Sequence, residues 1–495
     1  MKGTFTRLWG VMLVCATTGS VASTERFGWE PPPVVDVIVV GGGGAGLSAA
    51  VTVAEQGLSV WVLEKMPAIG GNTLRASGLF NAVDPQREPA MGEQDTAERY
   101  YSQMILSGGG ESSPAVVKAL VDHTYPTLKW LESLGLKFRP QTVVTWGAEW
   151  PRGHKPLEPR GQGYIRVLSS TLLTLGGKIH TNTRVVGLLR DETGRIAGVT
   201  YAVETPSSET RSGSTKPQEV RSRYGVVLAS GGFAANPTLV KRYAPQYADL
   251  PTDNNPGNTG DLLAIAKGVG AQLVGLENIQ VVPGAPPGQP FQVRLDLDAS
   301  RFILVDHQGH RFIDEDEPRD ALARAVVDRL KAGVFSITNQ ATLDSFDVVT
   351  QRDIYKGLET GSAFRAETLE ALAQAIHVPV KALKTSVEQF NQEAIKHTGK
   401  CARAMCTPLS SGPFWASPLS MTVHSTMGGV VIDPLARVLN AKGEPIAGLY
   451  AAGEVTGNVH GANRIGGNGI ADAITFGRIA GRELAREAKA LANKK

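Results

Sequence analysis

The stretch DVIVVGGGGAGLSAAVTVAEQGLSVWVLEK, residues 36–65, decides the fold of this chain. An apolar run from Val37 to Val40 predicts a buried strand. It is followed by glycines in the pattern GxGxxG, an alanine-rich helix and a second apolar strand that ends at Glu64. The first glycine permits a tight turn, the second lets the backbone approach a pyrophosphate, and the third allows close helix–strand packing. Because strand, helix, strand and terminal acid occur in this order, the stretch predicts a Rossmann-type dinucleotide site.

Three further glycine-rich stretches favour FAD over NAD as the dinucleotide. KMPAIGGNTLRASG (65–78) places a second glycine loop directly after the ribose-binding acid, which suits the long ribityl chain of a flavin. Residues 446–481 predict a strand, a glycine loop and a helix that begins near Gly469 and presents a second helix N-terminus to the flavin ring. YGVVLASGGFAAN (224–236) predicts the return strand of the nucleotide domain. A chain that closes on its cofactor from both ends fits FAD better than NAD.

Length and composition indicate a globular protein of two or three domains, because 495 residues exceed one ordinary core. The net charge of +3, from 50 basic and 47 acidic residues, gives no electrostatic case for nucleic acid. At the N-terminus, Lys2 and Arg7 precede the apolar run LWGVMLVCATTG, which is too short to span a membrane. The small residues that follow predict a signal peptide, 1–22, cleaved near Ala22. We therefore expect an exported, periplasmic protein without stable membrane insertion.

The remaining cysteines and histidines predict no metal and no haem. After cleavage the chain would keep Cys401 and Cys406, which in an oxidising compartment would form either a disulfide or two thiols, and the spacing does not choose between them. No CxxCH motif is present, so the chain carries no c-type haem. The histidines show no metal spacing.

RFIDEDEPRD, residues 311–320, is the most densely charged segment. A charge run is usually a solvated loop, and the alternative is that Arg319, held between Pro318 and Asp320, transfers protons. The overlapping stretch RFILVDHQGHRFID (301–314) alternates around Gly309 and predicts a β-hairpin that would hold Arg319 rigidly at its exit.

With these stretches in place, the chain resembles the fumarate reductase and succinate dehydrogenase flavoprotein superfamily. The closer resemblance is to its soluble, exported branch, the flavocytochrome-c-type fumarate reductases and their relatives that act on urocanate and other acrylates. The resemblance covers nearly everything after residue 35. Its motifs are GGGGAGLSAA, GGNT, ASGGF, NTGD, RFIDE followed by RD, HSTMGG and AAGEVTGNVHGANRIGGN.

The resemblance implies a reductase of the C=C bond of an α,β-unsaturated carboxylate. Arg319, in the RD dipeptide, corresponds to the family's proton donor, whereas His424 of HSTMGG and Arg464 of GANRIGGN correspond to residues that bind a substrate carboxylate. Hydride would pass from flavin N5 to the β-carbon while negative charge grows on the α-carbon and carboxylate. Cationic donors at that position lower the barrier.

Two departures from the family pattern argue against fumarate. Where fumarate reductases have a histidine in a QTHP-like segment, this chain has IQVVPG, and Val281 and Val282 cannot donate a hydrogen bond. Where they have EAVRG, it has RLDLDAS, which places Asp296 and Asp298 near the substrate. Asp296 is the best match to a carboxylate that binds the imidazole of urocanate. Alternatively the two aspartates serve the proton relay or a strand edge, and Val282 and Phe80 form an apolar wall for an aryl or alkyl acrylate.

The expected architecture is α/β: a discontinuous Rossmann-type FAD-binding domain, residues 36–235 and 376–495, with an inserted α+β capping domain, residues 236–375.

A separate cytochrome c or quinol dehydrogenase would supply electrons. The alternatives are a flavin dehydrogenase or oxidase working in the opposite direction, similar to ketosteroid dehydrogenases, a fumarate reductase with an altered carboxylate clamp, or a non-catalytic flavoprotein. The residues expected to contact non-covalent FAD are Gly41, Gly43, Gly44, Ala45, Gly46, Glu64, Lys65, Gly71, Asn72, Thr73, Ser77, Gly78, Gly231, Asp261, Gly453, Glu454, Gly467, Asn468 and Ile470.

Overall fold

A mostly parallel sheet forms around the first strand of the opening motif in the computed structural model. The strands follow the order β18-β19-β9-β1-β2-β5, and β6, β7 and β8 extend the sheet from β9. Strand β1 pairs in parallel with β2 on one side and with β9 on the other, and its side chains from Val37 to Val40 are buried. The strands are β1 (Val34–Val40), β2 (Val60–Leu63), β5 (Lys178–His180), β6 (Thr183–Arg190), β7 (Ile196–Thr205), β8 (Gly213–Ser214), β9 (Gln218–Leu228), β18 (Arg437–Leu439) and β19 (Pro445–Ala451).

The structure describes most of the chain from residue 33 onward. The described ranges are 33–87, 95–145, 147–205, 213–214, 216–284, 293–296, 300–315, 317, 319–346, 348–396 and 406–492. Residues 1–22, the predicted signal peptide, and Asp298 therefore lie outside the described residues. Cys406 takes part in a disulfide, and Cys401 lies outside the described residues, so the pairing of these two cysteines stays a prediction. Among the described residues, no helix has both the length and the apolar character needed to cross a bilayer.

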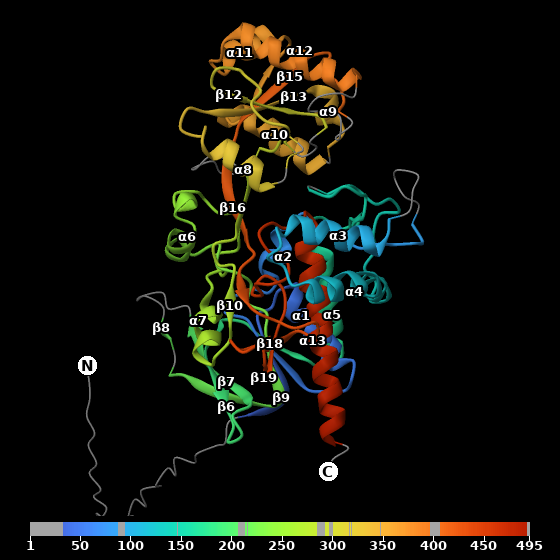
Figure 1. The fold of residues 1–495 in the computed structure, drawn as a ribbon, viewed down its shortest axis with the longest axis vertical. Coiled ribbons are helices and arrows are strands. Elements are labelled where there is room, and N and C mark those ends of the chain that lie inside the picture. Colours follow the sequence, from blue (N-terminus) through green and yellow to red (C-terminus); the bar gives the residue numbers. More distant parts are fainter. Residues whose placement is uncertain are drawn as a thin grey trace, which may run out of the picture. The chain divides into compact units, whose positions relative to one another are not determined.

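Two helices from opposite ends of the chain pack against each other on the main sheet. Helix α1 (Gly44–Ala54) is buried along its whole length, and α13 (Asn468–Ala492) lies beside it, as Figure 1 shows in blue and red. Glycines in α13 allow this approach: a Cβ at Gly477 would lie 2.2 Å from the carbonyl oxygen of Ala45. The ends of the chain therefore meet at the nucleotide turn, as the sequence predicts. Helices α3 (Ala97–Ser107), α4 (Pro114–Ser133) and α5 (Gln162–Thr174) complete this layer.

A second, antiparallel sheet has the order β12-β13-β15-β14 and its own hydrophobic core. Its strands are β12 (Ile303–Asp306), β13 (Val334–Asn339), β14 (Phe364–Ala366) and β15 (Phe414–Pro418), and its helices are α9 (Gln340–Asp344), α10 (Val348–Thr360), α11 (Leu369–Ala375) and α12 (Val380–Lys396). Leu383 and Phe390 of α12 are fully buried against this sheet. This core includes buried side chains on both sides of residue 376, as far as Ala416, and the expected domain boundaries stay a prediction.

The two sheets are joined by a two-stranded ribbon of β11 (Ile279–Gly284) and β16 (Ser420–Thr426). Helix α8 (Arg319–Val327) packs against both strands of this ribbon. Nearby elements are α6 (Pro237–Tyr243), the 3₁₀ helix η1 (Pro245–Tyr247), α7 (Asp261–Gly268), β10 (Leu273–Val274) and β17 (Gly429–Val430), and a short pair forms from β3 (Phe80–Asn81) and β4 (Gly153–His154), with α2 (Gly71–Arg75) before it.

Within the charged segment, the described side chains of residues 311–315, 317 and 320 are partly or fully buried rather than fully solvated. The hairpin predicted over residues 301–314 turns at Gly309, where φ is +77°, but its second arm makes a single bridge, between Val305 and Arg311. Strand β12 pairs instead with β13. The Arg311 guanidinium binds the buried Glu315 carboxylate at 2.5 Å and Glu393 at 2.8 Å. Arg311 and Glu315 of the charge run therefore stabilise the fold.

Removing the Glu315 carboxylate is expected to destabilise the chain. Glu315 is 2% exposed and also accepts a hydrogen bond from the backbone N–H of Leu304, so Glu315→Ala leaves Arg311 buried with its main partner gone. Loss of one partner of a buried ion pair costs about 3–5 kcal/mol. Urea denaturation followed by tryptophan fluorescence measures the shift in midpoint. Asp320→Asn is the control, because the Asp320–Arg324 pair is exposed and contributes at most about 1 kcal/mol. Equal shifts for both variants would contradict this role of Glu315.

Candidate active site

The turn between β1 and α1 is built for a dinucleotide. Gly41 has φ of +112°, and a Cβ at Gly46 would lie 1.9 Å from the carbonyl oxygen of Gly41, so both positions require glycine. A Cβ at Gly43 would meet no atom within 4 Å, which leaves the turn open on the side of the helix N-terminus. Glu64, at the end of β2, accepts hydrogen bonds from the N–H of Gly42 at 2.7 Å and of Met66 at 2.8 Å. These are the features that a pyrophosphate and a ribose need.

The second glycine loop closes over this turn. The N–H of Gly70 donates to the carbonyl oxygen of Gly42 at 2.8 Å, and the N–H of Gly44 donates to the Thr73 hydroxyl at 3.0 Å. Asn72 donates to the Glu454 carboxylate at 3.1 Å and so joins the loop to the C-terminal segment. The residues predicted to contact the cofactor from sequence positions near 41, 71 and 454 are therefore neighbours in space.

The C-terminal segment completes the cradle. Gly453 has φ of +76°, and a Cβ there would lie 3.1 Å from the side chain of Ala45. Helix α13 begins at Asn468, one residue before the predicted start, and its side chain accepts hydrogen bonds from Asn81 at 2.6 Å and Tyr100 at 2.8 Å. Within this group the Asn468 Nδ2 donor is buried without a partner. An unsatisfied buried donor beside an open glycine turn suits a polar cofactor such as FAD.

The other residues predicted to contact FAD lie around this cradle. Lys65 binds Asp261 at 2.8 Å, and Asp261 also pairs with Arg184. Burial acts to raise the pKa of the Asp261 carboxyl, but the hydrogen bond from Lys65 and the charges of Lys65 and Arg184 outweigh it and the pKa is lowered. Gly231 is close to Asn258, and Gly78 is close to the backbone of Arg160. Ile470 is buried in α13, and Ser77 is exposed. The residues present thus fit FAD, with Gly41, Gly43, Gly46, Glu64 and the 453–470 segment as the ones that would hold it.

The glycine at position 43 offers a test of this fit. Its φ of −80° is allowed for alanine, and the added Cβ would meet no protein atom, so Gly43→Ala should fold normally. Because the methyl group would occupy the approach to the pyrophosphate, we expect FAD to bind about 5- to 150-fold more weakly, from an overpacking cost of about 1–3 kcal/mol. Titration of the apoprotein with FAD, followed by flavin fluorescence, measures this. Gly46→Ala, which clashes with backbone, should instead lower stability before FAD is added. Wild-type FAD affinity for Gly43→Ala would show that the pyrophosphate does not approach there.

Arg464 is a buried cation without a carboxylate partner among the described residues. It is 8% exposed, its guanidinium donates to the Gln280 side chain at 3.1 Å, and its Nε is buried with no hydrogen-bond partner. The group lies against Gly469, in the first turn of α13. Burial lowers the pKa of Arg464, and the charges of Glu454, Asp472 and Asp253 offset part of that effect. An unpaired guanidinium held at a helix N-terminus is prepared to bind an anion.

His424 projects from a β-bulge in the ribbon. Gln280 pairs with Ser425 and Val281 with Val423, so His424 is the extra residue on β16. Bulges redirect a side chain, and they are common beside active sites. The His424 Nδ1 lies 2.7 Å from the Asp253 carboxylate. His424 and Arg464 are also brought together: Gln280 pairs with the residue after His424 and hydrogen-bonds Arg464.

Asp296 is fully buried and is already bound by an arginine. Arg294 donates to its two carboxylate oxygens at 2.7 and 2.8 Å, which is a bidentate pair. Burial acts to lower the pKa of Arg294, but the charge of Asp296 outweighs it and the pKa is raised. The role of Asp296 in binding a substrate imidazole stays a prediction, and such an imidazole would compete with Arg294.

The remaining predicted substrate residues are placed as follows. Val282 is 7% exposed on β11, in the ribbon that carries His424. Phe80 is fully buried in the main core, where β3 pairs with β4. Arg319 is the first residue of α8, which packs on the ribbon. Its side chain lies outside what the structure describes, and its role as proton donor stays a prediction.

The sequence did not reveal that Asp253 contacts His424, or that Arg294 makes a bidentate pair with Asp296. Asp253 is separated from His424 by 171 residues along the chain, and nothing in the loop TDNNPGNTGD distinguishes it from the other polar residues. By contrast Arg294 lies two residues from Asp296, so that pair had a local signal.

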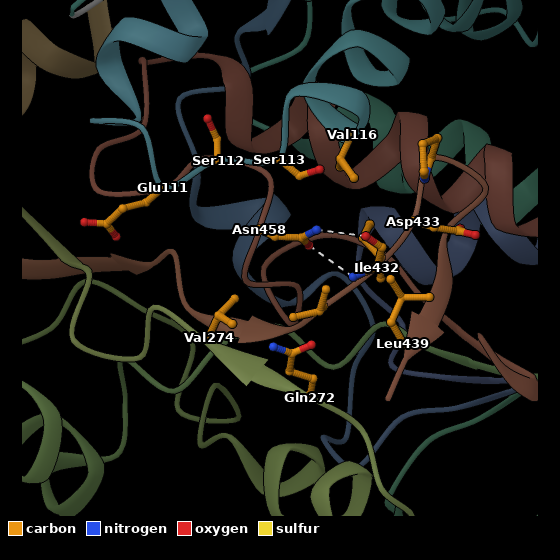
Figure 2. Close-up of a pocket in the computed structure, with 12 residues that line it drawn as sticks. Glu111, Ser112, Ser113, Val116, Gln272, Val274, Ile432, Asp433, Leu439 and Asn458 are labelled. Carbon is orange, nitrogen blue, oxygen red and sulfur yellow. Dashed lines mark hydrogen bonds between the residues drawn. The ribbon is translucent and has the colours of Figure 1, made fainter. Parts of the chain in front are cut away.

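A separate pocket of about 390 Å³ lies at the start of α4 and contains none of the predicted site residues. Figure 2 shows the Asn458 side chain directed at Ile432, to whose backbone it makes two hydrogen bonds, at 3.1 and 2.8 Å. Asp433 in turn accepts from the backbone of Leu435 and Arg437. Asn458 and Asp433 are thus satisfied by the protein itself, whereas the Ser112 hydroxyl is buried without a hydrogen-bond partner among the described residues. Among the described residues, no cluster of three His, Cys, Asp or Glu side chains is arranged to hold a metal ion.

Comparisons with known proteins agree with an FAD-binding site at this turn. The model of the FAD binding domain family matches residues 36–470. The chain is 35% identical over 501 residues to the NADH:acrylate oxidoreductase of Vibrio harveyi, covering 88% of this chain and 49% of that protein. It is 34% identical over 449 residues to the fumarate reductase (cytochrome) of Shewanella frigidimarina, covering 90% and 76%. It is 31% identical over 460 residues to the urocanate reductase of Eggerthella lenta, covering 89% and 73%.

The chain spans about half the length of the first of these relatives. Among solved structures, the open conformation of a flavocytochrome c3 fumarate reductase superimposes with a TM-score of 0.74 at 30% identity, covering 92% of this chain and 79% of that one. This likeness confirms the predicted α/β class with a parallel-sheet FAD-binding domain. The chain belongs to the FAD binding domain family and to the fumarate reductase flavoprotein superfamily that its motifs resemble, with FAD as its cofactor.

Proposed function

We propose that this protein reduces the C=C bond of an α,β-unsaturated monocarboxylate, an acrylate rather than fumarate. The observation that carries the proposal is Arg464, a buried guanidinium without a carboxylate partner among the described residues. A buried charge is costly unless it is paired, so a substrate carboxylate is the natural partner. His424, on the bulge, would add a third hydrogen bond to the two that Arg464 can donate.

The chain's own residues would bind the substrate, exclude water and supply a proton. Arg464 and His424 would hold the carboxylate, and both would stabilise the negative charge that grows there during reduction. FAD, when bound, supplies the hydride for the β-carbon. Arg319, at the N-terminus of α8, would protonate the α-carbon. Val281 and Val282 offer an apolar surface on the same ribbon.

Three features weigh against fumarate and favour a simple acrylate. The ribbon presents valines where a second carboxylate would need donors. Asp253 adds negative charge beside His424. The imidazole of urocanate would need Asp296, whose oxygens already accept two hydrogen bonds from Arg294. An alkyl or aryl acrylate needs neither donors for a second carboxylate nor the Asp296 carboxylate for an imidazole.

We further propose that FAD is held non-covalently, that the protein is exported to the periplasm, and that a separate cytochrome c or quinol dehydrogenase supplies electrons.

Anaerobic turnover with a reduced viologen tests the proposal. The FAD-loaded protein is offered acrylate, crotonate, cinnamate, urocanate and fumarate in parallel, and viologen reoxidation is followed by absorbance. We expect turnover with at least one of the alkyl or aryl acrylates and at least tenfold less with fumarate. Turnover with urocanate alone would restore Asp296 as the imidazole ligand. No turnover with any of the five would contradict the reductase assignment.

A further inference from the structure

We infer that Asp253 positions His424 for the substrate carboxylate and makes the site select monocarboxylates over dicarboxylates. This inference rests on the proposed function, because it assigns a role within the same binding site. Asp253 lies in the loop between η1 and α7, outside every motif that the sequence analysis singled out. Its carboxylate Oδ2 is 2.7 Å from His424 Nδ1.

Hydrogen bonds hold the loop that carries Asp253 against β16 on both sides of His424. The N–H of Val423 donates to the carbonyl oxygen of Pro251 at 2.8 Å, and the Thr252 hydroxyl donates to the carbonyl oxygen of Val423 at 2.8 Å. Asn254 donates from its side chain to the carbonyl oxygen of His424 at 2.9 Å. Arg75 donates to the carbonyl oxygen of Asp253. Because these bonds fix the backbone around Asp253, its carboxylate is held against the imidazole rather than free to rotate away.

The contact decides how the imidazole is oriented. An ionised carboxylate only accepts hydrogen bonds, so Nδ1 of His424 must carry the proton that it shares with Asp253. This fixes the ring and directs Nε2 away from Asp253. A fixed ring binds a substrate carboxylate in one geometry and loses little rotamer freedom on binding. Replacing the carboxylate with an amide allows the ring to turn over, so the cost falls on substrate binding rather than on the chemical step.

The charge of Asp253 acts on the whole cation cluster. Burial lowers the pKa of Arg464 and the field of Asp253 offsets part of that effect; the same field adds to the raised pKa of Arg294, so Asp253 lies within electrostatic reach of both guanidinium groups. The Asp253 side chain is 36% exposed, so solvent screens part of this effect. A second carboxylate on the substrate would meet this negative charge, whereas a neutral alkyl or aryl group would not. Like charges that meet in a partly buried site are disfavoured.

Asp253→Asn separates this role from a purely structural one. The variant keeps the size of the side chain but removes one negative charge, so we expect KM for an accepted acrylate to rise about tenfold while kcat changes less than about threefold. The preference for propionate over succinate should fall by about tenfold or more. Asp253→Glu, which restores the charge, should recover most of that preference. Thr252→Val, which removes a hydroxyl bond of the same loop without changing charge, should leave the preference within about twofold of wild type.

Binding of the saturated acids propionate and succinate is measured on the FAD-loaded protein by the change in flavin absorbance, and turnover is measured in parallel. If Asp253→Asn lowers the propionate preference and wild type turns over no acrylate, the role of Asp253 holds and the proposed function fails. If wild type is active and Asp253→Asn keeps the wild-type preference, the inference is overturned. An equal loss of preference in Thr252→Val would also overturn it, because the effect would then come from the loop backbone.

Discussion

Replacing Arg464 is expected to abolish most acrylate reduction while leaving the protein at least as stable. The reason is that its guanidinium is buried and, among the described residues, its terminal nitrogens bond only the Gln280 side chain and its Nε has no partner. Loss of one partner of a buried, hydrogen-bonded charge pair costs about 2–5 kcal/mol. For Arg464→Met this corresponds to a loss of roughly 30- to 4,000-fold in kcat/KM. Arg464→Lys should recover little, because an ammonium cannot make two parallel bonds to a carboxylate.

The stability of the same variant distinguishes a binding group from a structural one. An unpaired buried charge destabilises a fold, so Arg464→Met should raise the thermal midpoint of the substrate-free protein or leave it unchanged. A structural arginine would do the opposite. Arg478 is the matched control: it lies on α13, its side chain donates to the carbonyl oxygen of Pro126 and stacks on Trp130, and burial lowers its pKa to about 10. Arg478→Met should leave kcat/KM within about twofold. A large drop in midpoint for Arg464→Met would contradict its assignment as the carboxylate ligand.

Replacing Arg319 is expected to slow turnover without weakening substrate binding. A general acid contributes about 10²- to 10⁴-fold to the rate, so Arg319→Gln should lose that factor in kcat and keep KM within about threefold. The position favours proton release, since Arg319 is the first residue of α8 and the positive end of a helix disfavours a cation there, by about 0.3–1 kcal/mol. Helix α8 also packs against the ribbon that carries His424.

Steady-state kinetics with an accepted acrylate tests the role of Arg319. Arg324→Gln is the control, because Arg324 lies on the same helix and makes an exposed ion pair with Asp320, and its loss should change kcat less than about twofold. Added guanidinium ion should restore part of the activity of Arg319→Ala. A rise in KM with kcat unchanged would assign Arg319 to substrate binding instead.

The FAD cradle could be predicted from sequence because its geometry is local. The turn of Gly41, Gly43 and Gly46 and the acid Glu64 lie within one strand–helix–strand unit, where glycine spacing alone fixes the backbone. The second glycine loop and the segment 453–470 are also short strand–turn–helix patterns, and the structure brings them to the same place. The family motifs likewise identified His424 and Arg464, and the structure places them near each other on β16 and before α13.

The charge balance of the substrate site was decided only by the tertiary structure. Asp253 meets His424 across 171 residues, and no local pattern encodes a contact of that length. Glu315, in a segment with the composition of a surface loop, is buried because Arg311 pairs with it inside the core. The sequence around Asp296 would read the same whether its carboxylate were unpaired or neutralised by Arg294. Backbone turns follow from residue type over a few positions, whereas the partner of a charge depends on which distant elements pack together. The sequence therefore determined the cofactor, and packing determined which charges of the proposed substrate site are paired.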